Sequence, residues 1–482
     1  MLTRKSILST GTLAALVLAG NAWSSPDLAQ QFEQNAQHLA YLPHKVAPFR
    51  LELKQRLIAM PRYHNGVLYV ATGKGGLRQR GLVAALSTKS GKLLWETSLP
   101  NLSMTEPVVG GNRVVVGLGG NRMYFRNVGY GCYSPFPHEW LALNARTGKP
   151  VWTFQTRCQD MPTPFLAGNL VIGPAGGDGI LAVHIRDGTL AWRINLRGWS
   201  AMSSPAVVGA VFYVGLNGLS KKDNRFYAIN WKTHRVVWST NFPKAVNLSE
   251  PSPVVGEGKV FTAFMERGES PLTKIAPSGF FPAWNFHVVA LQAATGKLLW
   301  NRYLYTEYGR TPQGFWRNVE MFGDLLYRGT LAQLNRWVPG EWVNRHLSGN
   351  AAAKTKAGIH NPPLTYWKGE VFAEPRTGRM LYALDAETGK ILWRYPTQTT
   401  LANPNIHKGL LYTVSLKGYL TILNPRTGKR IFGEKLRMGG VGPTEVLLTK
   451  NGIVAGGADG TLLSARISPD CVDLAKNKFR DG

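Results

Sequence analysis

Cysteine is scarce in this chain of 482 residues: there are three, Cys132, Cys158 and Cys471. No two are adjacent and none forms a C-x-x-C pair, which argues against a cysteine-based metal centre or a disulfide-rich scaffold. Cys132 and Cys158 flank one of the repeats described below and could pair in an oxidising compartment. The sequence leaves inert thiols open as the alternative, because spacing shows no geometry.

Several catalytic signatures are also missing. The chain has no G-x-S-x-G elbow, no P-loop and no H-E-x-x-H, and its ten histidines show no metal-ligand spacing. The glycine-rich stretch 173–179 is interpreted as a turn rather than a phosphate cradle, since no helix is expected after it. We therefore predict no metal ion.

Long apolar runs are absent apart from residues 7–19, which are too short for a confident membrane span. Arg4 and Lys5 precede this run, and Ala22 and Ser24 suit a cleavage site. We predict a signal peptide over residues 1–24, followed by a soluble periplasmic protein over residues 25–482. No cysteine follows the apolar run, so a lipid anchor is not expected.

Carboxylates are few, with 28 Asp and Glu against 56 Lys and Arg and a net charge of +28. The cations are spread along the chain, which argues against a dedicated nucleic-acid groove. One interpretation is attraction to an anionic substrate or surface. The other is life in acid, because a fold with few carboxylates depends less on ion pairs that are lost as the pH falls. The two are compatible.

What the chain does contain is a repeated hairpin, clearest at residues 381–393 (LYALDAETGKILW). An apolar strand is followed by a turn, in which Gly389 can adopt a positive φ, and by a second strand that ends in Trp393. Six other copies occur at residues 83–95, 141–152, 181–192, 226–238, 288–300 and 420–432. Each is preceded by another strand pair, which gives four strands per unit.

Repeats of about 40 residues with four strands are typical of propeller blades. An eighth unit at residues 441–467 lacks the final strand, and residues 49–53 (FRLEL) could supply it and close the ring. We predict an all-β protein: an eight-bladed β-propeller of four-stranded antiparallel blades, in one domain with a large insertion around residues 303–379.

The hairpins resemble the tryptophan-docking repeats of the quinoprotein (PQQ-like) propellers. The pattern A-x-[DN]-x-x-T-G-K-x-x-W is best matched at residues 142–152 and 383–393. The resemblance implies the fold, with indoles packed between neighbouring blades. It does not select a function, since that superfamily includes redox enzymes, hydrolases and scaffolds.

Two intervals are longer than a blade requires, between Trp238 and Trp300 and between Trp300 and Trp393. The second contains the insertion, which is rich in tryptophan and arginine. Long loops in compact domains are usually functional or interfacial. The insertion is therefore either a substrate lid or the contact of a homodimer.

Loops that enter the innermost strands of a propeller converge near its axis. Here they carry both carboxylates and cations, and we predict an anion site with acid/base groups there. The alternative for each residue is a hydrogen bond to the neighbouring blade. The candidates are Arg62, Glu106, Asp160, Glu250, Arg317, Glu320, His407 and Glu445.

Asp324 is ambiguous. It aligns with a hairpin turn, where Asp is an ordinary residue. It also lies in the insertion-bearing region beside Arg317 and Arg328, which makes it a catalytic candidate.

Three functions are compatible with these repeats. Quinone-dependent dehydrogenases resemble the chain in repeat pattern but generally carry adjacent cysteines, which are absent here. Non-catalytic outer-membrane assembly scaffolds are similar but are usually lipid-anchored. Tetrathionate hydrolases, exported propellers of acid-loving sulfur oxidisers, resemble the chain in their repeats, size, signal and carboxylate-poor composition.

The last resemblance implies hydrolysis of a sulfur–sulfur bond of tetrathionate, in acid, by a homodimer without a quinone cofactor. The sulfonate ends would be held by Arg62, Arg317 or Arg328 through charge-assisted hydrogen bonds. A carboxylate suits water activation at low pH, where His is protonated. Asp324 is the first candidate and Glu320 the second.

Overall fold

The computed structural model describes most of the repeat region. The described residues are 36, 39–53, 57, 59–74, 80–119, 137–157, 160–196, 198, 200, 202–218, 222–246, 248–268, 283–308, 364–374, 380–397, 403–415, 417–436, 438, 446–457 and 459–466. Every regular element among them is a β-strand. These residues include no helix with the length and apolar character needed to cross a membrane.

The repeated hairpin forms as predicted, and its turn shows why the residues recur. In the copy at residues 381–393, the Asp385 carboxylate accepts hydrogen bonds from the Thr388 amide and hydroxyl, both at 2.7 Å. Gly389 has φ +67° and donates its amide to the Asp385 carbonyl at 2.8 Å. A side chain is disfavoured at that φ, so the turn selects glycine.

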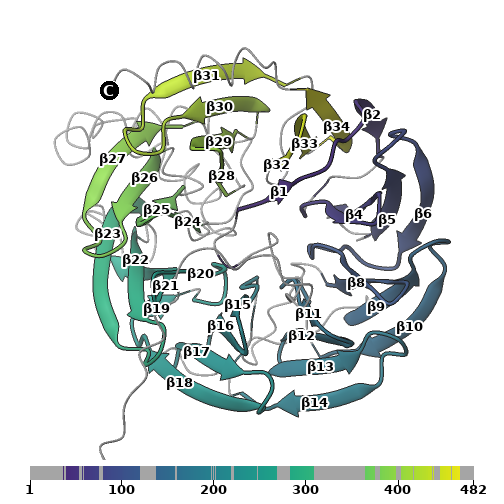
Figure 1. Cartoon of the computed structure of the whole chain (residues 1–482). Coiled ribbons are helices and arrows are strands. Elements are labelled where there is room, and N and C mark those ends of the chain that lie inside the picture. The colour runs from purple at the N-terminus through teal and green to yellow at the C-terminus, as the bar shows by residue number, and fades with distance from the viewer. Residues whose placement is uncertain are drawn as a thin grey trace, which may run out of the picture.

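Eight sheets surround a common axis and confirm the predicted propeller (Figure 1). The strands of the first four blades are β3 (Arg62–His64), β4 (Val67–Lys74), β5 (Arg80–Ser87) and β6 (Leu93–Leu99); β7 (Val108–Gly110), β8 (Arg113–Leu118), β9 (Glu139–Asn144) and β10 (Pro150–Gln155); β11 (Phe165–Ala167), β12 (Leu170–Pro174), β13 (Ile180–His184) and β14 (Leu190–Ile194); and β15 (Ala206–Val208), β16 (Val211–Leu216), β17 (Arg225–Asn230) and β18 (Arg235–Asn241).

The remaining blades follow the same order from the axis outward. Their strands are β19 (Ala245–Val246), β20 (Val254–Gly256), β21 (Lys259–Gly268), β22 (Ala283–Gln292) and β23 (Leu298–Tyr308); β24 (Leu364–Trp367), β25 (Glu370–Ala373), β26 (Met380–Asp385) and β27 (Ile391–Pro396); β28 (Asn405–His407), β29 (Leu410–Val414), β30 (Tyr419–Leu423) and β31 (Arg430–Lys435); and β32 (Leu447–Thr449), β33 (Gly452–Gly456) and β34 (Thr461–Arg466). Consecutive strands within a blade pair antiparallel, except that β19 and β20 of blade 5 both pair with β21. Buried aliphatic side chains of the strands pack between blades.

The N-terminal segment completes the eighth blade. Strand β2 (Phe49–Glu52) pairs antiparallel with β34, which confirms that residues 49–53 supply its outer strand. Strand β1 (Tyr41–Leu42) also pairs, in parallel, with β32 on the axial side, which the sequence did not predict. Figure 1 shows β1 near the centre of the ring. Both ends of the repeat region therefore join in one sheet, which removes its free edge.

The tryptophan that ends each hairpin docks on the turn of the next blade. Trp300 donates its indole N–H to the Ala386 carbonyl at 3.1 Å, and a Cβ placed on Gly389 would meet its ring at 2.7 Å. Equivalent bonds join Trp95 to Ala145, Trp152 to Ile185, Trp238 to Ala293 and Trp393 to Pro425. The repeat thus encodes the contact between blades as well as the hairpin.

Blade 4 departs from this rule. His234 replaces the turn glycine at φ +58°, and its ring stacks on Trp192 at a centroid distance of 4.6 Å. The Trp192 indole nitrogen is buried and has no hydrogen-bond partner among the described residues. This boundary therefore substitutes a ring contact for the usual hydrogen bond.

Candidate functional site

The two faces of the ring carry different kinds of connection between strands. Because strands alternate in direction, the loops between second and third strands share one face with the connections between blades. We call this the loop face. The chain continues into residues 120–136, 269–282, 309–363 and 375–379 from strand ends on this face. The described strand ends that border these four ranges thus share one face of the ring.

Part of the predicted insertion belongs to the ring itself. Residues 303–308 are the end of β23, and residues 364–373 are β24 and β25. Strands β21, β22 and β23 have 10, 10 and 11 residues, longer than the strands of the other blades. Blade 5 therefore extends beyond its neighbours at the place where the chain leaves for residues 309–363.

Hydrogen bonds connect successive blade entries on the loop face. The Glu106 amide donates to Thr163 Oγ1 at 2.9 Å, the Thr163 amide to Ser204 Oγ at 2.9 Å, and the Ser204 amide to Ser252 Oγ at 3.0 Å. These bonds link blades 2 to 5 in sequence. Each of these buried backbone amides thereby finds a partner on the next blade.

Arg62 and Glu106, two predicted substrate-binding residues, lie together in this ring of contacts. Arg62 Nη2 is 2.7 Å from Glu106 Oε2, and both side chains are buried. Arg62 Nε also donates to the Pro107 carbonyl at 3.3 Å. Burial lowers the pKa of Arg62, and the charge of Glu106 opposes that shift. The pair joins blade 1 to blade 2.

The other described candidates lie elsewhere. Glu250 is half-buried at the entry to blade 5. His407 is at the far end of β28 from the blade entry, where its ring stacks on Tyr41 at 3.7 Å. Burial, with a smaller contribution from Lys408, lowers the pKa of His407 to about 4. His407 is thus not brought to the loop face.

The remaining candidates lie outside the described residues. These are Asp324, Glu320, Arg317, Arg328 and Glu445, together with Cys132 and Cys158 of the predicted disulfide.

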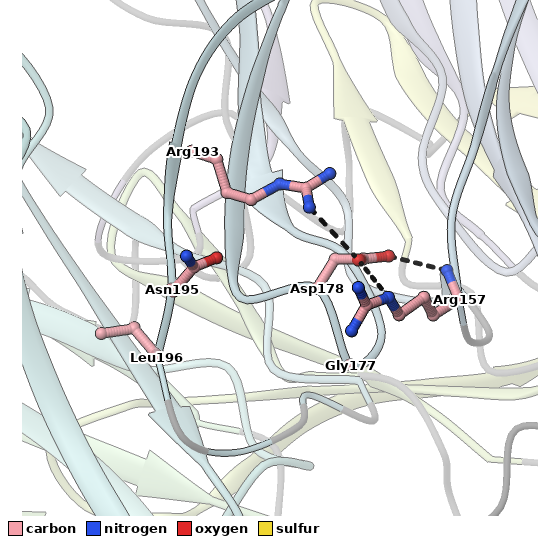
Figure 2. Close-up of a pocket in the computed structure, with 6 residues that line it drawn as sticks. All are labelled: Arg157, Gly177, Asp178, Arg193, Asn195 and Leu196. Carbon is pink, nitrogen blue, oxygen red and sulfur yellow. Dashed lines mark hydrogen bonds and ion pairs between the residues drawn. The ribbon is translucent and has the colours of Figure 1, made fainter.

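A pocket of about 320 Å³ opens on the loop face between blades 2 and 3. It is lined by Arg157, Gly177, Asp178, Arg193, Asn195 and Leu196. Arg157 follows β10, Asp178 lies in the turn between β12 and β13, and Arg193 is on β14. Figure 2 shows the two guanidinium groups approaching Asp178, with the Asn195 amide nearby.

Asp178 organises the pocket. Its Oδ1 is 3.3 Å from Arg157 Nε and 3.8 Å from Arg193 Nη1, and its Oδ2 accepts the Arg157 amide at 2.7 Å. The Asp178 side chain is 4% exposed, whereas those of Arg157 and Arg193 are 77% and 33% exposed. One buried carboxylate therefore holds two accessible guanidinium groups, which leaves the pocket with excess positive charge.

A second carboxyl group lies near Asp178. Asp160 is fully buried and accepts a hydrogen bond from the Thr156 hydroxyl. Burial raises the pKa of Asp160 well above its usual value; Thr156 opposes this shift, and the charges of Asp178 and Glu139 add to it. Burial thus disfavours the charged form of Asp160, so this side chain adds less negative charge near the pocket than an exposed aspartate would.

This arrangement suits a small oxyanion. Each guanidinium has five N–H donors, and Asp178 occupies few of them. Planar guanidinium groups bind carboxylate-like, phosphate-like and sulfonate-like oxygens well. The sequence interpretation of residues 173–179 as a plain turn missed this pocket. An Asp within this glycine-rich loop was the signal in the sequence for a polar site. The two arginines that meet Asp178 come from after β10 and from β14, so nothing in the sequence indicated the contact.

Glu374 is a further buried acid on the loop face, at the end of β25. Its Oε2 accepts the Thr413 hydroxyl of blade 7 at 2.7 Å. Burial raises the pKa of Glu374 to about 7, against the opposing effect of the Thr413 and Thr397 hydroxyls. No group of three or more His, Cys, Asp or Glu side chains is placed to hold a metal ion in the described part of the chain.

Fold and repeat chemistry define a class: an eight-bladed propeller with tryptophan-docked, PQQ-like blades. The chain belongs to the family described as outer membrane protein assembly factor BamB, whose sequence model matches residues 21–131, 137–321 and 285–468. This confirms the predicted PQQ-like repeats.

Two characterised relatives point to different functions. The chain is 25% identical over 366 residues to a tetrathionate hydrolase of Acidithiobacillus ferrooxidans, and the match covers 72% of this chain and 61% of that protein. It is 24% identical over 240 residues to the outer membrane protein assembly factor BamB of Yersinia pestis, covering 46% and 52% respectively. The chain thus matches between half and two thirds of the length of each relative.

Solved structures share the fold. BamB from Moraxella catarrhalis superposes with a TM-score of 0.56 at 15% identity, covering 88% of this chain and all of that one. A europium-containing methanol dehydrogenase superposes with a TM-score of 0.54 at 12% identity, covering 89% and 90%. At these identities the likeness concerns the fold alone.

Proposed function

We propose that this protein is a hydrolase that cleaves a sulfur–sulfur bond of tetrathionate. One water and one tetrathionate dianion would give thiosulfate, sulfate, elemental sulfur and two protons, which balances atoms and charge. The observation that carries the proposal is the 25% identity to a tetrathionate hydrolase over 72% of the chain.

The pocket between blades 2 and 3 supports an anionic substrate. Tetrathionate carries a sulfonate at each end and stays charged in acid. Arg157 and Arg193 present guanidinium donors around the buried Asp178. The net charge of +28 would favour the approach of any anion.

Two carboxylates in the range 309–363 are the proposed catalytic groups. Asp324 would position and deprotonate the attacking water, with Glu320 as the second candidate, and Arg317 and Arg328 would bind sulfonate oxygens. A carboxylate fits this role in acid because its pKa lies near the working pH. Arg62 and Glu106 are engaged with each other, so we assign them to the blade 1–blade 2 contact in this mechanism.

Turnover is the direct test. Purified protein should release thiosulfate from tetrathionate at acidic pH without added quinone. Asp324→Asn should abolish turnover and keep the fold. Asp187→Asn is the matched control, since Asp187 is an exposed turn residue that accepts hydrogen bonds from Thr189. Near-normal turnover by Asp324→Asn would return Asp324 to a turn role and direct attention to Glu320.

A second candidate is a non-catalytic assembly scaffold, which is favoured by the BamB description of the family. Under that proposal the protein would consume no tetrathionate and would co-purify with membrane-assembly partners. A quinone-dependent dehydrogenase is tested separately, by adding pyrroloquinoline quinone, calcium and an alcohol and measuring oxidation of the alcohol with an artificial electron acceptor.

Export and assembly are proposed alongside the activity. We expect a signal peptide cleaved near Ser24, a periplasmic product and a homodimer. N-terminal sequencing of the secreted protein and sedimentation equilibrium test these points. If sedimentation shows a monomer, the insertion would be assigned to a substrate lid and not to a contact between subunits.

A further inference from the structure

The face opposite the loop face is strongly basic. It is formed by the turns between first and second strands and between third and fourth strands, and we call it the turn face. Every blade contributes at least one exposed cation to it. These are Lys89, Lys92, Arg146, Lys149, Arg186, Lys232, Arg235, Lys297, Lys368, Lys390, Lys408, Arg426, Lys429, Arg430 and Lys450.

Negative charge on these turns is sparse among the described residues. The exposed carboxylates there are Asp187, Glu257 and Glu387. Glu387 is already paired with Lys259 at 2.6 Å. The repeat places its cations at equivalent positions, so the excess of charge is spread over the whole ring rather than gathered in one groove.

Exposed aliphatic side chains border the same face. They stand at the start of the outer strands, directly after the turns, on six successive blades. The most exposed are Leu93, Leu94, Val151, Leu190, Val236, Val237, Leu298, Leu299 and Leu392, at 39–53%. Large apolar residues repeated around a surface indicate an interaction surface more than scattered exposure does.

At the start of the outer strands, which we call the rim of the turn face, a cation stands directly before an exposed aliphatic residue in several blades. Lys92 precedes Leu93, Arg235 precedes Val236, and Lys297 precedes Leu298. A surface that combines exposed apolar groups with Lys and Arg is the composition of proteins that lie on anionic bilayers. A soluble polyanion would need the charge but would leave the aliphatics uncovered.

We propose that the turn face docks on a membrane surface that contains anionic lipids. The broad distribution of charge fits an extended partner, and the rim aliphatics fit the boundary between headgroups and acyl chains. In this orientation the loop face, with the pocket between blades 2 and 3, points away from the lipid. The proposal does not depend on tetrathionate hydrolysis.

The experiment is co-sedimentation with vesicles of phosphatidylcholine alone and with added phosphatidylglycerol, at low ionic strength. The parent chain should bind the mixed vesicles and be released as salt is raised to about 1 M, where the screening length is about 3 Å. The turn-face variant carries Lys92→Glu, Lys149→Glu, Lys297→Glu and Lys390→Glu. Its binding should fall on the order of a hundredfold or more.

The matched control carries Lys222→Glu, Lys244→Glu, Lys417→Glu and Lys435→Glu. These exposed lysines lie on the loop face, and the change in net charge is the same. The control should retain most of the binding. Equal loss in both variants would show that net charge alone acts and would overturn the proposal, as would no binding by the parent chain.

A third variant separates a bilayer from a soluble polyanion. Leu94→Ser combined with Leu299→Ser and Leu392→Ser should weaken vesicle binding several-fold and leave binding to heparin unchanged. Vesicle binding that is insensitive to these changes would assign the face to a soluble polyanion instead. Circular dichroism checks that each variant is folded.

Discussion

Two blade boundaries bury a carboxyl group in opposite ways. Between blades 1 and 2, Glu106 is paired with the guanidinium of Arg62 at 2.7 Å. Between blades 6 and 7, Glu374 is bonded to the neutral hydroxyl of Thr413 at 2.7 Å. The first arrangement requires a carboxylate that stays charged, whereas the second favours a protonated acid.

The difference bears on life in acid more directly than composition does. As the pH falls, protonation of Glu106 would leave the buried Arg62 charge without its partner, which costs free energy. Glu374 gains in the same change, because burial favours its neutral form. Tolerance of acid therefore depends on which partner each buried carboxyl group has, and not only on how few carboxylates there are.

Breaking the pair between blades 1 and 2 should have the largest effect. Arg62→Met leaves Glu106 buried without its cation and should lower the free energy of unfolding by about 3–5 kcal/mol. The double variant Arg62→Met with Glu106→Leu removes both charges and should be more stable than Arg62→Met alone. Urea denaturation at neutral pH measures both. A double variant that is less stable still would mean that the pair is strongly net stabilising.

The Glu374 boundary should give a stability that falls as the pH rises. The folded protein holds this proton up to about pH 7, whereas an unfolded glutamate releases it near 4.5. Stability from this group is thus complete below the unfolded pKa and decreases between about 4.5 and 7, by roughly 3 kcal/mol in total.

Glu374→Gln tests that sign. Gln resembles the protonated acid, so the variant should match the parent at pH 4 and be more stable at pH 8. Glu434→Gln, an exposed change of the same charge on blade 7, is the control. Thermal unfolding across this pH range provides the measurement, and parallel curves for parent and Glu374→Gln would refute the assignment.

The outer strands allow a second comparison between blade boundaries, through the tryptophan that each blade docks on the next. Trp393 donates to the Pro425 carbonyl at 2.7 Å, whereas the Trp192 indole nitrogen lacks a partner among the described residues. Trp393→Phe should therefore cost about 1 kcal/mol more than Trp192→Phe. Both variants lose a similar apolar area, so the difference in unfolding free energy isolates the hydrogen bond. Equal losses would contradict it.

The smallest effect is expected at His407. Its folded pKa of about 4 lies below the ordinary value of 6.5, so this group loses stability as the pH falls from 6.5 towards 4. The side chain is partly exposed, which limits the size of the effect. His407→Gln should slightly reduce the loss of stability in that window, as measured by thermal unfolding at pH 4 and pH 7. An unchanged difference between the two pH values would show that His407 does not contribute.

The sequence was sufficient for most of the ring. Residues 381–393 and their copies specify strand, turn and strand through adjacent residues, and the positive φ of Gly389 is a local requirement of that turn. The closing strand at residues 49–53 was predictable because an eighth unit lacked its outer strand. The candidate site was harder to predict from the sequence. Asp324 and Glu320 remain predictions, and the pocket around Asp178 was not anticipated.

The sequence alone was enough for the repeat: seven hairpins, an incomplete eighth unit, and the expectation that indoles pack between neighbouring blades. These follow from periodicity and turn chemistry, which act over a few residues. The assembled fold was needed to show that Arg62 meets Glu106, that Arg157 and Arg193 meet at Asp178, and that Glu374 faces a hydroxyl. Such contacts depend on how one rigid sheet lies against another, and no local pattern encodes that placement.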